Sequence, residues 1–301
     1  MNHRSALTAL HCGALMFGFT GVLGKLAATT PSMIVFGRAL FAVVALAVFA
    51  RFMSRTPWQR LGGADYKRLA LGGVLLAGHW VSFFISVKVA GVAIATLGFT
   101  SFPALTVILE GLIFRERIRR NEIVLVCLVT IGLVLVTPEF NLASGATAGL
   151  LWGVLSGLLF ALLSLVNRAG SGKVGPVQSA LCQNLVVALC LVMFAGPAIP
   201  TVSAMDWLWI ALLGIFCTGV AHSLFVASLD VLKARTAAVV FALEPVYGIT
   251  FAWLIFSESP TPRMMVGGAL IIFAIFLSAR MGDGKTVEPV DAQAAPDAEK
   301  T

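Results

Sequence analysis

The sequence predicts an all-α polytopic membrane protein with ten transmembrane helices, arranged as two inverted repeats of five. Three observations support this fold class: an extreme composition, ten long apolar segments, and a second half that repeats the first. Of the 301 residues, 59% are hydrophobic and only 12% are charged, whereas soluble proteins carry about 25% charged residues. The mean hydropathy of +0.96 is typical of a chain that lies mostly in lipid.

Ten segments approach the length of about 20 apolar residues that a helix needs to cross the hydrocarbon core. The connections between them are short, and most contain Pro, Gly, Ser or Thr. Residues 282–301 are polar and rich in Pro and Ala, so we expect them to form a disordered tail. The ten predicted spans are residues 5–28, 31–52, 68–88, 91–114, 121–137, 145–168, 174–195, 205–228, 233–256 and 262–281.

The second half of the chain repeats the first. Residues 100–120 and 242–262 share a framework in which each matched residue stands 142 positions after its partner. The matched pairs include Phe99 with Phe241, Pro103 with Pro245, and Glu116 with Glu258. Helices one to five therefore resemble helices six to ten in order. The predicted repeats are residues 1–140 and 141–281, followed by the tail at 282–301.

The basic residues indicate how the chain lies in the membrane. If the N-terminus is cytoplasmic, 17 of the 21 Lys and Arg residues fall in cytoplasmic segments. The external segments then hold only Lys25, Lys88 and Arg263, and Arg38 lies within a helix. This excess follows the positive-inside rule and predicts cytoplasmic N- and C-termini. The net charge of +7 is therefore explained by topology, and it does not indicate nucleic-acid binding.

An odd number of helices per repeat places the second half upside down in the membrane. The loop at 114–122, FRERIRRNE, is then cytoplasmic, and its counterpart at 256–264, FSESPTPRM, is external. Many secondary transporters are built from inverted repeats and bind their substrate between them. The repeat therefore favours a transporter of small molecules.

The sequence resembles the drug/metabolite transporter superfamily, of the EamA type, in three features. It has ten predicted helices, these form two inverted halves, and helices four and nine each carry a Pro followed 13 residues later by Glu. The resemblance covers residues 5–281 and extends to the bacterial exporters of aromatic amino acids. It implies a basket-shaped bundle with an aromatic-rich central cavity in a bacterial inner membrane. It also implies export of aromatic and other neutral amino acids by alternating access. His79, Phe83, Phe17 and Phe99 stand where the resemblance places cavity residues.

Two prolines within predicted helices are candidates for hinges. Pro103 and Pro245 each lack a backbone donor and so free the carbonyl four residues earlier, which belongs to Phe99 and to Phe241. In a membrane, such a carbonyl must find a partner or line a wet cavity. We interpret the prolines as kinks that expose these carbonyls to the substrate, with a packing kink as the alternative.

Two intramembrane histidines are candidates for substrate binding, because ionisable groups in a membrane usually face the bundle interior or water. His79, Phe83 and Ser86 share one face of a helix, and His222 lies on the matching helix eight. An imidazole beside aromatic rings suits the polar head and apolar side chain of an amino acid. The alternative is a hydrogen-bonded core histidine. The predicted substrate-binding residues are His79, Phe83, Phe17, Phe99, Phe160, Ser164, His222 and Glu244.

Two charged residues depart from the repeat. Glu244 corresponds to Phe102, and its carboxylate could attract a substrate ammonium group, carry a proton, or pair with Arg38. Arg38 corresponds to Gln183, and it could pair with a carboxylate, snorkel toward the interface, or bind a substrate carboxylate.

Helix six carries a stripe of small residues with four-residue spacing. Such a stripe lets another helix approach closely, either within one chain or between two chains. Phe160 and Ser164 lie on the adjacent stripe, where they face either the cavity or the lipid. The stripe consists of Gly145, Gly149, Gly153, Gly157 and Ala161.

The sequence contains no H-E-x-x-H, G-x-S-x-G or P-loop pattern, so we predict neither an enzyme nor a bound metal or cofactor. The predicted partners are an amphipathic small molecule and the lipid bilayer, and the sequence is compatible with a monomer. Three alternatives remain: a multidrug or cationic-metabolite exporter, a membrane enzyme that uses His79, His222 and Glu244, and a receptor or scaffold that does not transport.

Overall fold

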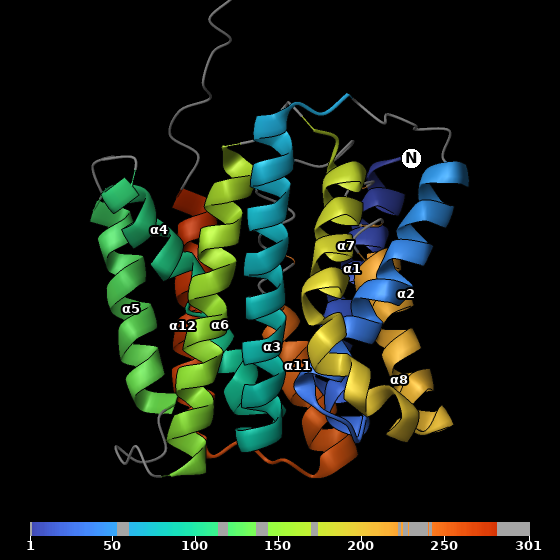
Figure 1. Cartoon of the computed structure of the whole chain (residues 1–301). Helices are drawn as coiled ribbons and strands as arrows, with labels where there is room; N and C mark the ends of the chain where they lie inside the picture. The colour runs from blue at the N-terminus through green and yellow to red at the C-terminus, as the bar shows by residue number, and fades with distance from the viewer. Residues whose placement is uncertain are drawn as a thin grey trace, which may run out of the picture.

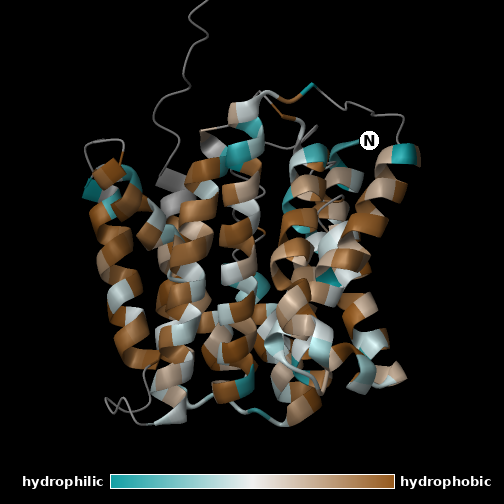
Figure 2. Ribbon diagram, in the orientation of Figure 1, coloured by the Kyte–Doolittle hydropathy of each residue, from teal (hydrophilic) through white to brown (hydrophobic). Residues whose placement is uncertain are grey.

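The computed structural model describes residues 2–52, 60–113, 120–136, 144–169, 174–221 and 243–281, together with residues 224, 228 and 240. All regular elements in this part of the chain are helices, and most run along a common direction (Figure 1). Hydrophobic residues predominate along the helices (Figure 2). The fold class predicted from the composition is confirmed.

The first half contributes five helices: α1 (His3–Leu26), α2 (Pro31–Phe52), α3 (Gly63–Phe99), α4 (Phe102–Ile113) and α5 (Arg120–Val136). The second half contributes α6 (Gly145–Arg168), α7 (Pro176–Ala195), α8 (Ala204–Gly214), α11 (Glu244–Phe256) and α12 (Pro262–Met281). A short 3-10 helix, Gly196–Thr201, follows α7, and a π-helix, Ile215–Val220, follows α8.

Five of the described helices are long and apolar enough to cross a membrane. Five shorter apolar helices belong to the other predicted spans, of which the span at 233–256 is described mainly through α11. The long helices are His3–Leu26, Pro31–Phe52, Gly63–Phe99, Gly145–Asn167 and Val177–Thr201.

The repeat is visible in the bounds of the helices. Helices α1 and α6 both have 24 residues, and they begin at His3 and Gly145. Helices α4 and α11 both begin on the residue before a matched proline, Pro103 or Pro245. The helix that carries the matched proline therefore begins at the same place in both halves.

This interruption corrects the predicted helix at 91–114. The structure has no continuous helix there, because α3 ends at Phe99, Thr100 and Ser101 form a turn, and α4 begins at Phe102. The proline lies in the first turn of the new helix, where its missing donor costs no hydrogen bond. The chain is therefore broken near Pro103, whereas the sequence predicted only a kink.

A second correction concerns the turn between the third and fourth predicted spans. α3 runs through this turn with a sharp kink at Gly91, where φ is +83°. Residues with a side chain rarely adopt this backbone conformation, whereas glycine adopts it freely. A Cβ atom at this position would also lie 3.0 Å from both carboxylate oxygens of Glu258.

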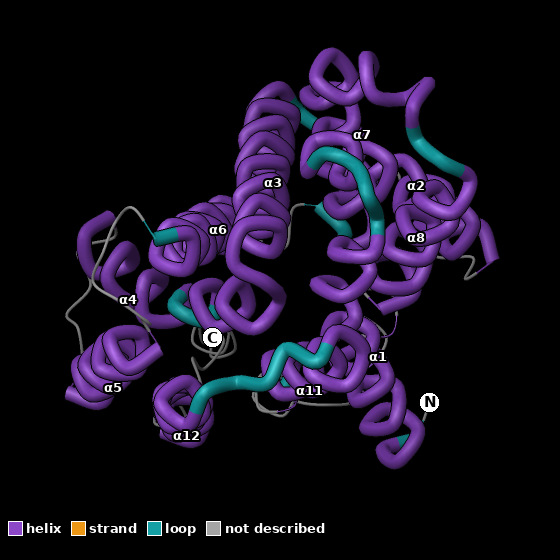
Figure 3. Tube along the Cα trace, turned by 90° about the horizontal axis from the view of Figure 1, so that it is seen from below, coloured by secondary structure: helices purple, strands orange, loops and turns teal. Residues whose placement is uncertain are grey.

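The two halves pack against each other through many helix pairs. α3 packs on α6, α2 on α7, α1 on α11 and α5 on α12, so each of these pairs joins one helix from each half. Seen along the bundle, α6 lies beside α3, and α1 lies beside α11 (Figure 3). The centre of the molecule is therefore the contact between the halves.

The glycine stripe of α6 lies in this contact. A Cβ atom at Gly153 would lie 3.0 Å from the carbonyl oxygen of Ala95 and 3.1 Å from the Cα of Gly98. A Cβ atom at Gly157 would lie 3.0 Å from the carbonyl oxygen of Phe99. Of the two alternatives that the sequence left open, the structure shows the stripe packed within one chain.

Candidate functional site

An aromatic cluster forms where α6 crosses the interrupted fourth span. We call it the His79 cluster, and it consists of His79, Phe83, Phe99, Phe102 and Phe160. The His79 ring lies 5.1 Å from the ring of Phe99 and 5.0 Å from that of Phe160, measured between centroids. Phe102 stacks on Phe99 at 5.2 Å and meets Phe160 edge-on at 5.1 Å. Phe83 meets Phe99 edge-on at 6.2 Å.

Ser156 on α6 fixes the orientation of the His79 ring. The Nδ1 atom of His79 lies 2.7 Å from the hydroxyl oxygen of Ser156 and 3.1 Å from its carbonyl oxygen. A carbonyl can only accept, so Nδ1 carries the proton. The Ser156 hydroxyl in turn donates to the His79 carbonyl at 3.1 Å. A neutral ring held in this way offers Nε2 as an acceptor for a ligand.

The break before α4 leaves polar groups without helical partners. Pro103 cannot donate to the carbonyl of Phe99, which lies against Gly157. The Ser101 hydroxyl is buried and has no hydrogen-bond partner. In a membrane protein, interrupted backbone of this kind is tolerated where it is buried in protein or lines a cavity. The break therefore leaves the unpartnered Ser101 hydroxyl beside the apolar rings of Phe99 and Phe102 in the chain.

Arg38 on α2 forms a second polar centre. Its side chain is almost fully buried, at 3% exposure, and its Nε donates to the hydroxyl of Thr218 over 2.7 Å. Its guanidinium carbon lies 3.9 Å above the Trp80 ring, in a cation–π contact. Its Nη1 has no hydrogen-bond partner. We call Arg38, Thr218 and Trp80 the Arg38 centre.

Thr218 belongs to the π-helix Ile215–Val220, and its hydroxyl donates to the carbonyl of Leu213 at 3.1 Å. π-Helical turns are frequent at functional sites. Glu244, the half-buried first residue of α11, attracts Arg38 electrostatically, but the two side chains form no ion pair within 4.0 Å. The pairing of Glu244 with Arg38 that the sequence suggested is therefore not a direct contact in this structure.

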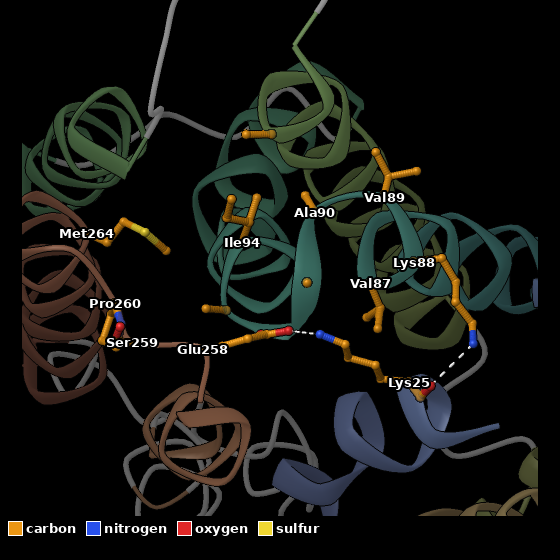
Figure 4. Close-up of a pocket in the computed structure, with 13 residues that line it drawn as sticks. Lys25, Val87, Lys88, Val89, Ala90, Ile94, Glu258, Ser259, Pro260 and Met264 are labelled. Carbon is orange, nitrogen blue, oxygen red and sulfur yellow. Dashed lines mark hydrogen bonds and ion pairs between the residues drawn. The ribbon is translucent and has the colours of Figure 1, made fainter. Parts of the chain in front are cut away.

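A third group of contacts closes the bundle at the Gly91 end, shown in Figure 4. Glu258, just past α11, forms an ion pair with Lys25 on α1 and accepts a 3.1 Å hydrogen bond from the backbone N–H of Val92. We call Lys25, Glu258 and Val92 the Gly91-end clamp. Lys88 donates to the carbonyls of Lys25 and Ala27 nearby. A hollow of about 660 Å³ opens beside these residues.

The structure brings four of the predicted binding residues together: His79, Phe83, Phe99 and Phe160. Ser164 lies one turn along α6 from Phe160 and donates to its carbonyl at 2.9 Å. Two predicted residues lie elsewhere: Phe17, half-buried on α1 and outside the ring contacts of the His79 cluster, and Glu244 on α11. His222 falls outside the described residues.

Sequence reasoning did not identify Phe102, Ser156, Trp80 or Thr218 as site residues. A signal existed for Phe102, because it is the repeat partner of Glu244 and stands beside Pro103. No local pattern points to Thr218 or Trp80, because they meet Arg38 from two other helices.

A model of the EamA-like transporter family matches residues 4–137 and 147–280, one match for each half of the bundle. The chain belongs to the EamA-like transporter family. The double match agrees with the predicted family and with the two repeated halves seen in the fold. It makes the chain a multi-pass membrane transporter.

Two curated relatives of this EamA-like transporter are described as transporters without a known solute. The uncharacterized transporter YxxF of Bacillus subtilis (strain 168) is 22% identical over 96% of this chain and 95% of its own. An uncharacterized transporter of Archaeoglobus fulgidus is 24% identical over 90% of this chain and 95% of its own. A crystal structure whose protein is not named in its description covers 94% of this chain and 100% of its own, with 19% identity and a TM-score of 0.62, which supports the fold.

Proposed function

We propose that this EamA-like transporter exports aromatic and other neutral amino acids across a bacterial inner membrane, like the aromatic amino-acid exporter YddG that its sequence resembles. The observation that carries the proposal is the His79 cluster, with one oriented imidazole among four phenylalanine rings. Aromatic rings gain about 0.5–1.5 kcal/mol by stacking or edge contact beyond their burial. An aromatic side chain is the solute group that such a cluster suits best.

The polar head of an amino acid would find partners at the edge of the same cluster. The Nε2 atom of His79 and the Phe99 carbonyl are acceptors for an ammonium group. The Glu244 carboxylate, on α11 outside the cluster, is a further candidate. Each of these groups belongs to the contact between the halves or to the start of α11. A solute held there would touch both halves, as alternating access requires.

The proposed transport cycle moves the two halves about the starts of α4 and α11, at Pro103 and Pro245. In this conformation, the Gly91-end clamp ties α1, α3 and α11 together. Exposure of the solute at that end requires Glu258 to release Lys25 and Val92. The positive-inside pattern predicts that both termini are cytoplasmic. In that orientation the Gly91 end faces outward, and the clamp closes the exit.

The alternative of a multidrug or cationic-metabolite exporter is less well supported. A buried Arg38 near Glu244 opposes the attraction of a lipophilic cation to that carboxylate. A neutral zwitterion is less affected, because its carboxylate is attracted to Arg38.

Counterflow of labelled phenylalanine or tryptophan into liposomes tests the proposal, both with and without a pH gradient. Uptake without a gradient would make the protein an amino-acid carrier that needs no proton coupling. Uptake only with a gradient would assign a proton to the cycle. The proposal fails if neither amino acid moves in liposomes that do transport another solute.

A matched pair of variants tests the role of the cluster. Phe160→Leu removes three ring contacts within the His79 cluster, whereas Phe273→Leu changes a side chain that is 55% exposed on α12. The loss of about 0.5–1.5 kcal/mol corresponds to roughly 2- to 12-fold weaker binding of phenylalanine in the first variant. The second variant should match the wild type, and equal binding by both variants would remove the cluster from the substrate site.

A further inference from the structure

We propose that Arg38 binds the carboxylate of the transported solute through its free Nη1. This inference rests on the proposed function and specifies the solute as one that carries a carboxylate. Arg38 is buried at 3% exposure, and its Nη1 is a hydrogen-bond donor without a partner. A buried donor left without an acceptor destabilises the fold, and more strongly when it is charged. Native structures contain few such groups, and those that persist call for an explanation.

The rest of the guanidinium group is already fixed. Its Nε is occupied by the hydroxyl of Thr218 at 2.7 Å, and its face covers Trp80 at 3.9 Å. The plane of the group is therefore set by contacts from α3 and from the π-helix, and Nη1 is held in one direction. Arginine offers only donors, so the missing partner must be an acceptor. A carboxylate is the acceptor that matches both the charge and the planar geometry of arginine.

The part of the chain that the structure describes does not supply that carboxylate. Glu244 attracts Arg38, but within the described residues no carboxylate oxygen lies within 4.0 Å of its nitrogens. Charged groups inside a membrane are usually paired or face a pathway for substrate or ions. An arginine with one fixed face and one vacant donor fits the second case.

The repeat shows that the scaffold does not need this charge. Gln183 holds the corresponding position on α7, and its amide donates to the Oδ1 of Asn167 at 2.7 Å. A neutral side chain with a local partner therefore suffices at that position in the second half. The charge in the first half calls for a different explanation, and a ligand carboxylate provides it.

The test compares three ligands of the purified protein by thermal stabilisation: phenylalanine, 3-phenylpropionate, which lacks the ammonium group, and phenethylamine, which lacks the carboxylate. The wild type should be stabilised by phenylalanine and to a lesser degree by 3-phenylpropionate. Arg38→Gln should weaken both carboxylate ligands by about 10- to 100-fold, the range expected for one hydrogen bond to a charged group. Its response to phenethylamine should stay at the wild-type level.

Arg263→Gln is the matched control, because Arg263 is exposed at the Gly91 end and its only described hydrogen bond goes to the Val134 carbonyl. It should bind all three ligands as the wild type does. The inference is overturned if Arg38→Gln and Arg263→Gln bind the carboxylates equally well. If Arg38→Gln does not fold, the wild-type protein alone still tests the inference. Equal stabilisation of the wild type by phenethylamine and by phenylalanine would show that the carboxylate adds nothing, and would overturn the inference.

The outcomes separate this inference from the proposed function. Phenylalanine counterflow with unaltered carboxylate binding in Arg38→Gln would leave the amino-acid exporter standing and remove Arg38 from its site. Arg38→Gln could lose 3-phenylpropionate binding while the wild type shows no amino-acid counterflow. This result would support the carboxylate site at Arg38 and would reject amino acids as the transported solute. Stabilisation of the wild type by none of the three ligands would reject the carboxylate site.

Discussion

Replacing Gly153 with alanine should force apart the two halves of the bundle where α6 crosses α3. The new Cβ atom would lie 3.0 Å from the carbonyl oxygen of Ala95, 3.1 Å from the Cα of Gly98 and 3.5 Å from its carbonyl carbon. All three neighbours are backbone atoms, so no side chain can rotate away. The helices must move apart by several tenths of an ångström, and the contacts beside Gly153 must loosen with them.

The magnitude follows from two opposing terms. Overpacking of a tight contact costs about 1–3 kcal/mol. Alanine in a helix interior gains about 1 kcal/mol over glycine, so the net loss of unfolding free energy is up to about 2 kcal/mol. Gly145→Ala is the matched control at the start of the same stripe, where the nearest atom would be 3.7 Å away. It should change the stability by less than about 0.5 kcal/mol.

Thermal unfolding of the purified variants in detergent, followed by circular dichroism, measures the effect. We expect the midpoint of Gly153→Ala to fall by a few degrees below that of Gly145→Ala, and Gly153→Leu to fall further. Leucine has a helix propensity close to that of alanine, so the extra loss would come from the contact. If all three variants unfold at the wild-type temperature, the close packing of α6 on α3 is wrong.

Three further predictions concern the Gly91-end clamp, the hinge at Pro103 and the membrane topology. In a variant without native cysteines, Lys25→Cys with Glu258→Cys should form a disulfide that stops counterflow until it is reduced; full activity of the oxidised protein would exclude the Gly91-end clamp as a gate. Pro103→Ala restores a backbone donor to the break, so counterflow should slow severalfold while Pro200→Ala, in the 3-10 helix, leaves it unchanged; equal rates in the two variants would argue against a hinge at Pro103. A fluorescent protein fused to the C-terminus should fluoresce and an alkaline phosphatase fused there should be inactive, since we expect a cytoplasmic C-terminus; the reverse result would invert the predicted topology.

The sequence predicted the features that depend on local pattern. The long apolar segments predicted the helices, and the matched prolines marked the positions where α4 and α11 begin. The four-residue spacing of glycines on α6 predicted a close helix contact, although it did not identify α3 as the partner. Helical spacing, the repeat and the family resemblance led to the choice of His79, Phe83, Phe99 and Phe160, which the structure brings together; their role in binding stays a prediction.

Contacts between distant segments were not predictable in this way. Lys25 and Glu258 are 233 residues apart, and their pairing requires the first helix of one half to lie beside the fourth span of the other. The Arg38 centre joins α2, α3 and the π-helix, and nothing in the spacing of Trp80 or Thr218 reveals the meeting. The kink at Gly91 was hidden for another reason, because a glycine between two apolar runs is equally consistent with an ordinary loop.

The departures from the repeat help to specify the solute. The two halves share the same pattern of matched residues, yet Arg38 is aligned with Gln183, and Glu244 is aligned with Phe102. The first half therefore adds one buried cation, and the second half adds one carboxylate within its electrostatic range. A ligand with a single charge is attracted by one of these two groups and repelled by the other. A zwitterion can pair its carboxylate with Arg38 and its ammonium group with Glu244. On this reasoning phenylalanine should bind more tightly than either 3-phenylpropionate or phenethylamine, and tighter binding of either single-charge analogue would mean that only one of the two groups faces the solute.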